Sequence, residues 1–292
     1  MIMKKEKAFN WIIFIILSVL WGSSFILTKE SSKELNGWQI GSIRIFFAGL
    51  IFLPFAVFHI KDIPRQKIPF VILSGFLGNF FPAFLFAIAI EKKVESSLAG
   101  ILNSLTPLLV IVIAILFFKA KIESKKIAGV LIGFAGLLIL NFSAGGMTLH
   151  NFGFILLILL ATIFYGLNVN IVSYYLKEIE PFKIATVSLA ALCLIAGIIM
   201  WQQDIFSIVK YDEGARIFIV YAALLGIVGS AFATALFYIL IKRAGGLFAS
   251  LVTYGIPVVA IFWGVIVHEN VTVAQISCLA LILSGVYLAN RN

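Results

Sequence analysis

The sequence is poor in charged residues, which make up only 12% of its 292 positions. A soluble domain carries about 25% charged residues, and roughly half of its residues are apolar. This chain is 62% apolar, with a mean hydropathy of +1.12. No water-soluble packing could hide so many apolar side chains. The composition therefore excludes a soluble globular protein and indicates a chain that lies in a lipid bilayer.

Cysteine and histidine are also scarce, with two and three residues. Cys193 and Cys278 fall inside apolar runs, where a thiol packs as a small hydrophobic side chain, and they provide no disulfide framework. His268-Glu269 lacks the second histidine of a zinc-binding helix motif. There is also no nucleophile elbow and no pair of intramembrane carboxylates. We therefore expect no metal, no other cofactor and no enzymatic activity.

Acidic residues are missing from the middle of every apolar run. Glu30, Glu34, Glu91, Glu95 and Glu269 all lie near the ends of runs. Proton-coupled membrane proteins usually contain a buried group that titrates. The pattern therefore favours a process that is not driven by a proton gradient, or one with a less obvious coupling group.

Long apolar runs fill most of the chain. A transmembrane helix needs about 20 apolar residues, and lipid forbids open backbone structures. Reading the runs between charge clusters predicts an all-α integral membrane protein with ten transmembrane helices. The expected spans are 10–29, 37–59, 68–90, 94–118, 124–141, 151–174, 181–201, 215–241, 245–267 and 272–289. Their connections are too short for an extramembrane domain.

The basic residues follow an orientation pattern. With the N-terminus inside, the inner connections hold fifteen Lys and Arg residues and the outer connections hold six. Cytoplasmic loops carry the excess of Lys and Arg, so both termini are expected in the cytoplasm. The net charge of +9 is thus a topology signal, and no nucleic-acid partner is expected.

The chain repeats itself. Pro107 in "NSLTPLLVI" matches Pro257 in "TYGIPVVAI" at an offset of 150 residues, and "WGSSF" (21–25) matches "YGLNV" (165–169) at an offset of 144. The matches are collinear across residues 1–145 and 146–292. Each half has five spans, an odd number, so the second half enters the membrane from the opposite side. Such inverted repeats are typical of secondary transporters, whose binding site lies between the repeats near the midplane.

The sequence resembles the drug/metabolite transporter superfamily, specifically its EamA-like members with two five-helix repeats. The segments that carry the resemblance are "LWGSSFILTK" (20–29), "IGSIRIFFAGLIFLP" (40–54), "SSLAGILNSLTPLLVIVIAILFF" (96–118), "IAGVLIGFAGLLIL" (127–140), "LFASLVTYGIPVVAIFWGVIVHENV" (247–271) and "LILSGVYLA" (281–289). The resemblance covers essentially the whole chain. It implies the export of small metabolites, often amino acids.

Polar side chains inside the spans are candidates for a binding site, because each is costly in lipid unless it faces protein or water. Trp21 and Ser24 occupy places equivalent to Tyr165 and Asn168 in the repeat. Two related helices would thus bring an aromatic ring and a hydrogen-bonding group to similar depth. These residues form either a substrate cage or interhelical packing contacts.

Three prolines inside the spans each free the carbonyl of the residue four positions earlier. Pro107 and Pro257 free the carbonyls of Asn103 and Thr253, and Pro82 frees that of Gly78, next to Asn79. A carbonyl freed in this way is tolerable within the membrane only where it faces a cavity or a neighbouring helix. The candidate hinges are Pro82, Pro107 and Pro257. The candidate substrate-binding residues are Trp21, Ser24, Asn79, Asn103, Tyr165, Asn168, Thr253 and Tyr254.

Arg44 is the basic residue that lies well inside a span, roughly 10 Å deep at 1.5 Å per residue. It either attracts a carboxylate-bearing substrate or braces its helix by bonding to backbone carbonyls. Gly129 and Gly133 form a GxxxG pair, which allows close helix contact inside the protein or at a dimer seam.

Together these features predict a multi-pass exporter of the inner (plasma) membrane that works by alternating access. Its expected partners are a small-molecule substrate and the lipid bilayer, and its expected state is a monomer or a homodimer. The substrate would be an amino acid or a related amphipathic solute. The alternatives are a drug or other metabolite exporter and a non-transporting membrane scaffold.

Overall fold

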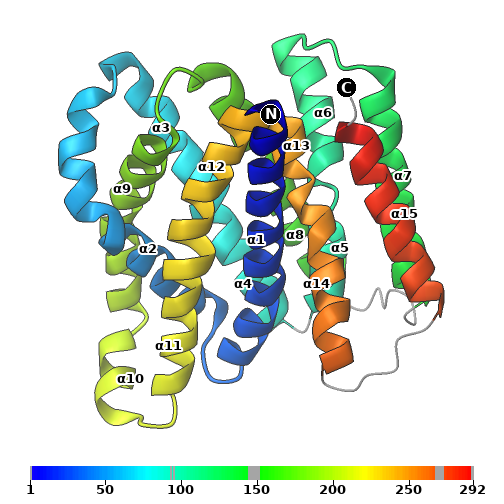
Figure 1. Ribbon diagram of the computed structural model, residues 1–292. Helices are drawn as coiled ribbons and strands as arrows, with labels where there is room; N and C mark the ends of the chain where they lie inside the picture. The colour runs from blue at the N-terminus through cyan, green and yellow to red at the C-terminus, as the bar shows by residue number, and fades with distance from the viewer. Residues whose placement is uncertain (1, 93, 95, 144–151, 267–272, 291–292) are drawn as a thin grey trace.

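The computed structural model describes residues 2–92, 94, 96–143, 152–266 and 273–290. Within these ranges the chain is helical and has no β-strand (Figure 1). The main elements are α1 (Ile2–Ser31), α2 (Gly37–His59), α3 (Ile68–Gly75), η3 (Phe76–Phe80), α4 (Phe81–Glu91), α5 (Ser96–Asn103), α6 (Thr106–Phe118), α7 (Ser124–Ser143), α8 (Phe152–Tyr175), α9 (Pro181–Gln202), α10 (Ile205–Tyr211), α11 (Arg216–Leu224), η5 (Leu225–Phe232), α12 (Ala233–Ala244), α13 (Gly246–Ser250), α14 (Val252–Ile266) and α15 (Val273–Asn290). Glu95, His268 and Glu269 lie outside the described residues.

Among the residues that the structure describes, six helical stretches are long and apolar enough to cross a bilayer, namely Glu6–Ser31, Gly37–Asp62, Arg65–Glu91, Gly153–Tyr175, Pro181–Gln202 and Arg216–Ala244. Shorter apolar helices cover Thr106–Phe118, Gly246–Val259 and Ala280–Ala289. These lengths agree with an all-helical integral membrane protein. The total of ten spans stays a prediction.

Two expected spans are not single helices. The span predicted at 94–118 is broken after Asn103, and α6 begins at Thr106 with Pro107 in its first turn. A proline at that position fits because its missing N–H has no helical partner there. The span predicted at 245–267 is divided at Leu251 into α13 and α14, with Pro257 inside α14. A short helix, α10, also forms in the connection between α9 and α11.

Two further spans contain a π-helical segment in mid-course. Segment η3 separates α3 from α4, immediately before Pro82, and η5 separates α11 from α12. A π-helical turn widens the helix locally and is often found at functional sites. Near Pro82 the chain therefore passes from a π-helix to an α-helix without a break.

Close packing joins the last helix of each half of the chain. Helix α7 lies beside α15 along one edge of the molecule (Figure 1). A side chain at Gly285 would collide with the backbone of Gly129 and Gly133, and one at Gly129 would collide with Ala289. The GxxxG pair is thus used for contact inside the protein, and this face is not free to form a dimer seam.

Candidate functional site

A cavity lies in the interior between α1, α2, α4, α8, α12 and the broken segments α5–α6 and α13–α14. Eight of the residues singled out from the sequence line it, and they are Trp21, Ser24, Arg44, Asn79, Asn103, Tyr165, Asn168 and Thr253. The space open to the centre of a water molecule is ≈ 70 Å³, which is room for several waters.

Aromatic rings form two walls of the cavity. On α1, the indole of Trp21 packs edge-on against Phe237, with ring centroids 5.0 Å apart, and its Nε1 donates to the carbonyl of Gly229 over 3.1 Å. On α8, the ring of Tyr165 stacks on Phe86 at 6.2 Å. The rings give the cavity apolar surfaces.

Two amides on the cavity surface are oriented by hydroxyls of α12. Thr234 donates to Oδ1 of Asn79 over 2.8 Å, and Tyr238 donates to Oδ1 of Asn168 over 3.4 Å. A Cβ at Gly78 would collide with the Asn168 amide. Helices α8 and η3 therefore approach closely because glycine occupies that position.

Arg44 is half-buried and projects its guanidinium from α2 toward η5. Its Nε donates to Oγ of Ser230 over 2.7 Å. In the part of the chain that the structure describes, this is its one hydrogen bond to protein, and no carboxylate forms an ion pair with it. This bond links α2 to η5 through a side-chain hydroxyl instead of a backbone carbonyl, and both roles considered for Arg44 stay predictions.

The carbonyls freed by two prolines have hydroxyl partners. Thr106 donates to the carbonyl of Asn103 over 2.6 Å, and Ser104 donates to the carbonyl of Thr253 over 3.1 Å. Both sites are buried. The freed carbonyls of Asn103 and Thr253 thus have hydrogen-bond donors within the protein. The bond from Ser104 to Thr253 joins the two halves of the chain.

Tyr254 was grouped with the cavity residues, and that placement is wrong. Its side chain is fully buried, and its hydroxyl donates to the carbonyl of Val130 in α7 over 2.8 Å. One residue along a helix turns the side chain by about 100°, so Tyr254 faces α7 while Thr253 faces the cavity.

Sequence reasoning missed several cavity residues, among them Phe86, Thr106, Thr234, Phe237 and Tyr238. The spacing of Thr234 and Tyr238, four residues apart on one helical face, was a usable signal. The phenylalanines carried none, because the sequence has 28 of them.

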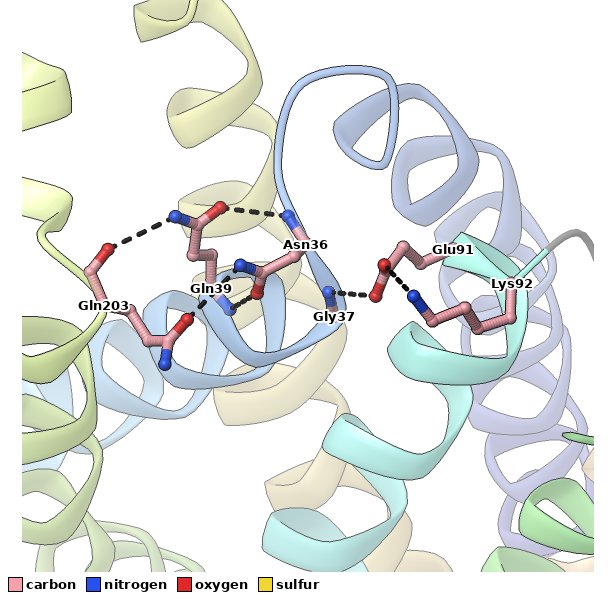
Figure 2. A network of polar contacts seen from close by, with 6 residues as sticks. All are labelled: Asn36, Gly37, Gln39, Glu91, Lys92 and Gln203. Carbon is pink, nitrogen blue, oxygen red and sulfur yellow. Dashed lines mark hydrogen bonds and ion pairs between the residues drawn. The ribbon is translucent and has the colours of Figure 1, made fainter.

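A network of polar contacts lies at the opposite end of α2 from His59 (Figure 2). Asn36 and Gln39 form a reciprocal capping box at the start of α2. Glu91, at the end of α4, accepts a hydrogen bond from the backbone N–H of Gly37 over 2.8 Å. Gln203, after α9, accepts from the Asn36 amide and from the Gln39 amide. The network links the start of α2 to the end of α4 and to the end of α9.

The residues that the structure describes contain no group of three or more His, Cys, Asp or Glu side chains that could hold a metal ion.

Comparison with known proteins identifies the family. The sequence profile of the EamA-like transporter family matches twice, at residues 9–142 and 153–291. An uncharacterized transporter of Archaeoglobus fulgidus is 23% identical over 97% of this chain and 99% of its own length. The uncharacterized transporter YdfC of Bacillus subtilis is 29% identical over 60% of this chain and 57% of its own.

More partial similarity extends to an S-adenosylmethionine uptake transporter of Rickettsia bellii, which is 25% identical over 43% of each chain. A protein of known crystal structure shares the fold, with a TM-score of 0.70 at 16% identity over 97% of this chain and 96% of that one. Because the profile covers nearly the whole sequence, this chain belongs to the EamA-like transporter family and is a multi-pass membrane transporter.

Proposed function

We propose that this protein is a secondary transporter that exports small amphipathic metabolites, amino acids or related compounds, by alternating access between two inverted five-helix repeats. The observation that carries the proposal is the cavity, which presents aromatic rings and hydrogen-bonding groups from α1 and α8. An amphipathic solute needs both kinds of surface.

The two sides of the cavity correspond to each other. Trp21 and Ser24 of α1 stand 144 positions before Tyr165 and Asn168 of α8, and all four line the cavity. The π-helical segments η3 and η5 occur in corresponding spans. This correspondence supports repeats at 1–145 and 146–292, with ten spans in total. The excess of Lys and Arg in the inner connections supports a plasma-membrane orientation with both termini in the cytoplasm.

Movement between the repeats has a physical basis in the broken segments. Helices α5 and α6 are discontinuous, as are α13 and α14, and both pairs contribute to the cavity wall. Discontinuous helices frequently surround transporter binding sites. Pro82, Pro107 and Pro257 are proposed as pivots, since no backbone N–H of these residues restrains the preceding turn.

Uptake of a sulfonium compound is a second candidate, because the Rickettsia bellii relative is named as an S-adenosylmethionine uptake transporter. The rings of Trp21 and Tyr165 suit a cation, which aromatic faces attract. Export of drugs or of other metabolites is compatible with the same lining.

Proteoliposomes test the function directly. The purified protein would be reconstituted and assayed for flux of labelled L-leucine, L-phenylalanine and S-adenosylmethionine in both directions. We expect saturable flux of at least one compound, and loss of that flux when Ser24→Trp fills the cavity. The matched control is Ser284→Trp on an exposed face of α15. Flux equal to that of empty liposomes for every compound would contradict the proposal.

A further inference from the structure

The cavity has an unbalanced charge. Among the described residues that line it, Arg44 is the one that carries a formal charge. Its Nε is used by Ser230, while its terminal Nη groups have no hydrogen-bond partner in the described part of the protein. Within a low-dielectric interior, an uncompensated cation is costly, and a bound anion is a direct way to compensate it.

Asn79 provides a second unsatisfied donor. Its Oδ1 accepts from Thr234, and its Nδ2 is buried without a partner. Buried polar groups are hydrogen-bonded in the great majority of cases, and exceptions mark strain, function or a missing ligand. Asn79 lines the same cavity as Arg44, and an acceptor on a solute bound there would satisfy its unused N–H groups.

The two donors are held side by side by one helix. Ser230 contacts Arg44, and Thr234, four residues later, contacts Asn79. Ser230 lies near the end of the π-helical segment η5 and Thr234 in the first turn of α12, so the two contacts are about one helical turn apart. Arg44 from α2 and Asn79 from η3 therefore both meet the junction of η5 and α12 at the cavity.

We propose that Arg44 and Asn79 bind the carboxylate group of the transported solute, and this inference rests on the proposed function. A guanidinium binds the planar carboxylate through parallel N–H donors, and the Asn79 amide adds a third donor. One positive charge matches a monocarboxylate better than a doubly charged phosphate ester. The rings of Trp21, Phe86 and Tyr165 then face the apolar part of the solute.

Matched ligand pairs isolate the carboxylate. The purified protein in lipid nanodiscs would be titrated with 3-phenylpropanoate and 3-phenylpropanamide, and with L-phenylalanine and L-phenylalaninamide, with binding followed by the shift in melting temperature. The wild-type protein is expected to bind each carboxylate at least tenfold more tightly than its amide, as charge-assisted hydrogen bonds predict.

Near-isosteric variants assign the effect to the two residues. Arg44→Gln and Asn79→Asp should each reduce the carboxylate preference to less than about threefold, whereas Arg44→Lys keeps part of it because the charge remains. Asn79→Asp retains the Thr234 contact and neutralises the site. Tyr254→Phe, outside the cavity, should match the wild type.

Equal binding of carboxylates and amides by the wild-type protein would overturn the inference, and so would an unchanged preference in Arg44→Gln. If a variant fails to fold, the wild-type ligand pairs and Arg44→Lys still test the carboxylate site.

The proteoliposome assay separates the carboxylate site from the proposed transport function. Transport of an amide with no preference for its carboxylate preserves the transport function and refutes the carboxylate site. Carboxylate binding that depends on Arg44, without any flux, would support the carboxylate site and contradict the transport function.

Discussion

The hydroxyl of Ser104 and the carbonyl of Thr253 are 3.1 Å apart and form a hydrogen bond between the two halves of the chain. The carbonyl is available because Pro257 has no N–H to bond to it. The single hydroxyl hydrogen of Ser104 is shared with a second acceptor in its own helix, the carbonyl of Gly100 at 2.9 Å. One hydroxyl thus bridges two discontinuous helices at the wall of the cavity.

Replacing Ser104 by alanine should leave the carbonyl of Thr253 unsatisfied. We expect a stability loss of about 1–2 kcal/mol, because a buried acceptor without a donor bears its full desolvation cost. Thermal melting in detergent measures the change. Ser284→Ala, whose hydroxyl is exposed and bonds within its own helix, is the control. A melting temperature of Ser104→Ala equal to that of Ser284→Ala would show that the interhelical bond contributes nothing.

Enlarging Gly285 should separate α7 from α15. Gly285→Val places a branched side chain against the backbone of Gly129 and Gly133, and we expect a loss of about 3 kcal/mol or more, since overpacking forces backbone shifts. Chemical unfolding of the reconstituted protein is the measurement. The control is Gly153→Val, because no atom of the described residues lies within 4 Å of a Cβ at Gly153. Equal losses in the two variants would rule out the close contact.

Removing the charge of Glu91 should loosen the polar network of Figure 2. Carboxylates near a helix N-terminus stabilise it by about 0.3–1 kcal/mol, and Glu91→Gln is expected to lose an amount of that order. Melting curves of this variant are compared with those of Glu34→Gln, an exposed acid outside α2. A larger loss in Glu34→Gln would contradict the role given to Glu91.

Access to the cavity should change with conformation. Single cysteines at Ser24 and Asn168, in a background with Cys193 and Cys278 replaced, would be treated with membrane-impermeant maleimides from each side. We expect labelling from one side at a time and a change of rate when a transported solute is added, as population shift requires. Inaccessibility from both sides under every condition would argue against a central pathway.

A proton gradient should not be required for flux. In the described lining of the cavity there is no Asp or Glu, so a carboxyl group there is not available to carry a proton. The proteoliposome flux is expected to persist when ionophores collapse the gradient. Strict dependence on the gradient would point to a coupling group elsewhere.

The sequence was informative at positions where a polar or amphipathic side chain interrupts an otherwise apolar span. Trp21, Ser24, Tyr165 and Asn168 stand out as polar or amphipathic side chains at related positions, and the structure brings all four to one cavity. Their role in binding remains a prediction. Arg44 stands out for the same reason.

Rotation and winding of the helices could not be predicted in the same way. Thr253 and Tyr254 are adjacent polar residues before the same proline, and only packing decides that one meets the cavity and the other α7. The π-helical turns at η3 and η5 depend on interhelical contacts such as Gly78 against Asn168. An apolar composition specifies a helix in lipid but not its local winding.

Under the proposed alternating access, the interlocked glycines of α7 and α15 would hold these two helices together while other helices rock. Two helices whose backbones touch have no room to slide, because bulk on either side would be met by backbone on the other. They are the last described helices of the two halves of the chain, so the pair would serve both proposed repeats as a fixed support. Ser284, exposed on α15, is therefore a suitable place for a fixed spectroscopic marker against which the displacement of α1 and α8 can be measured.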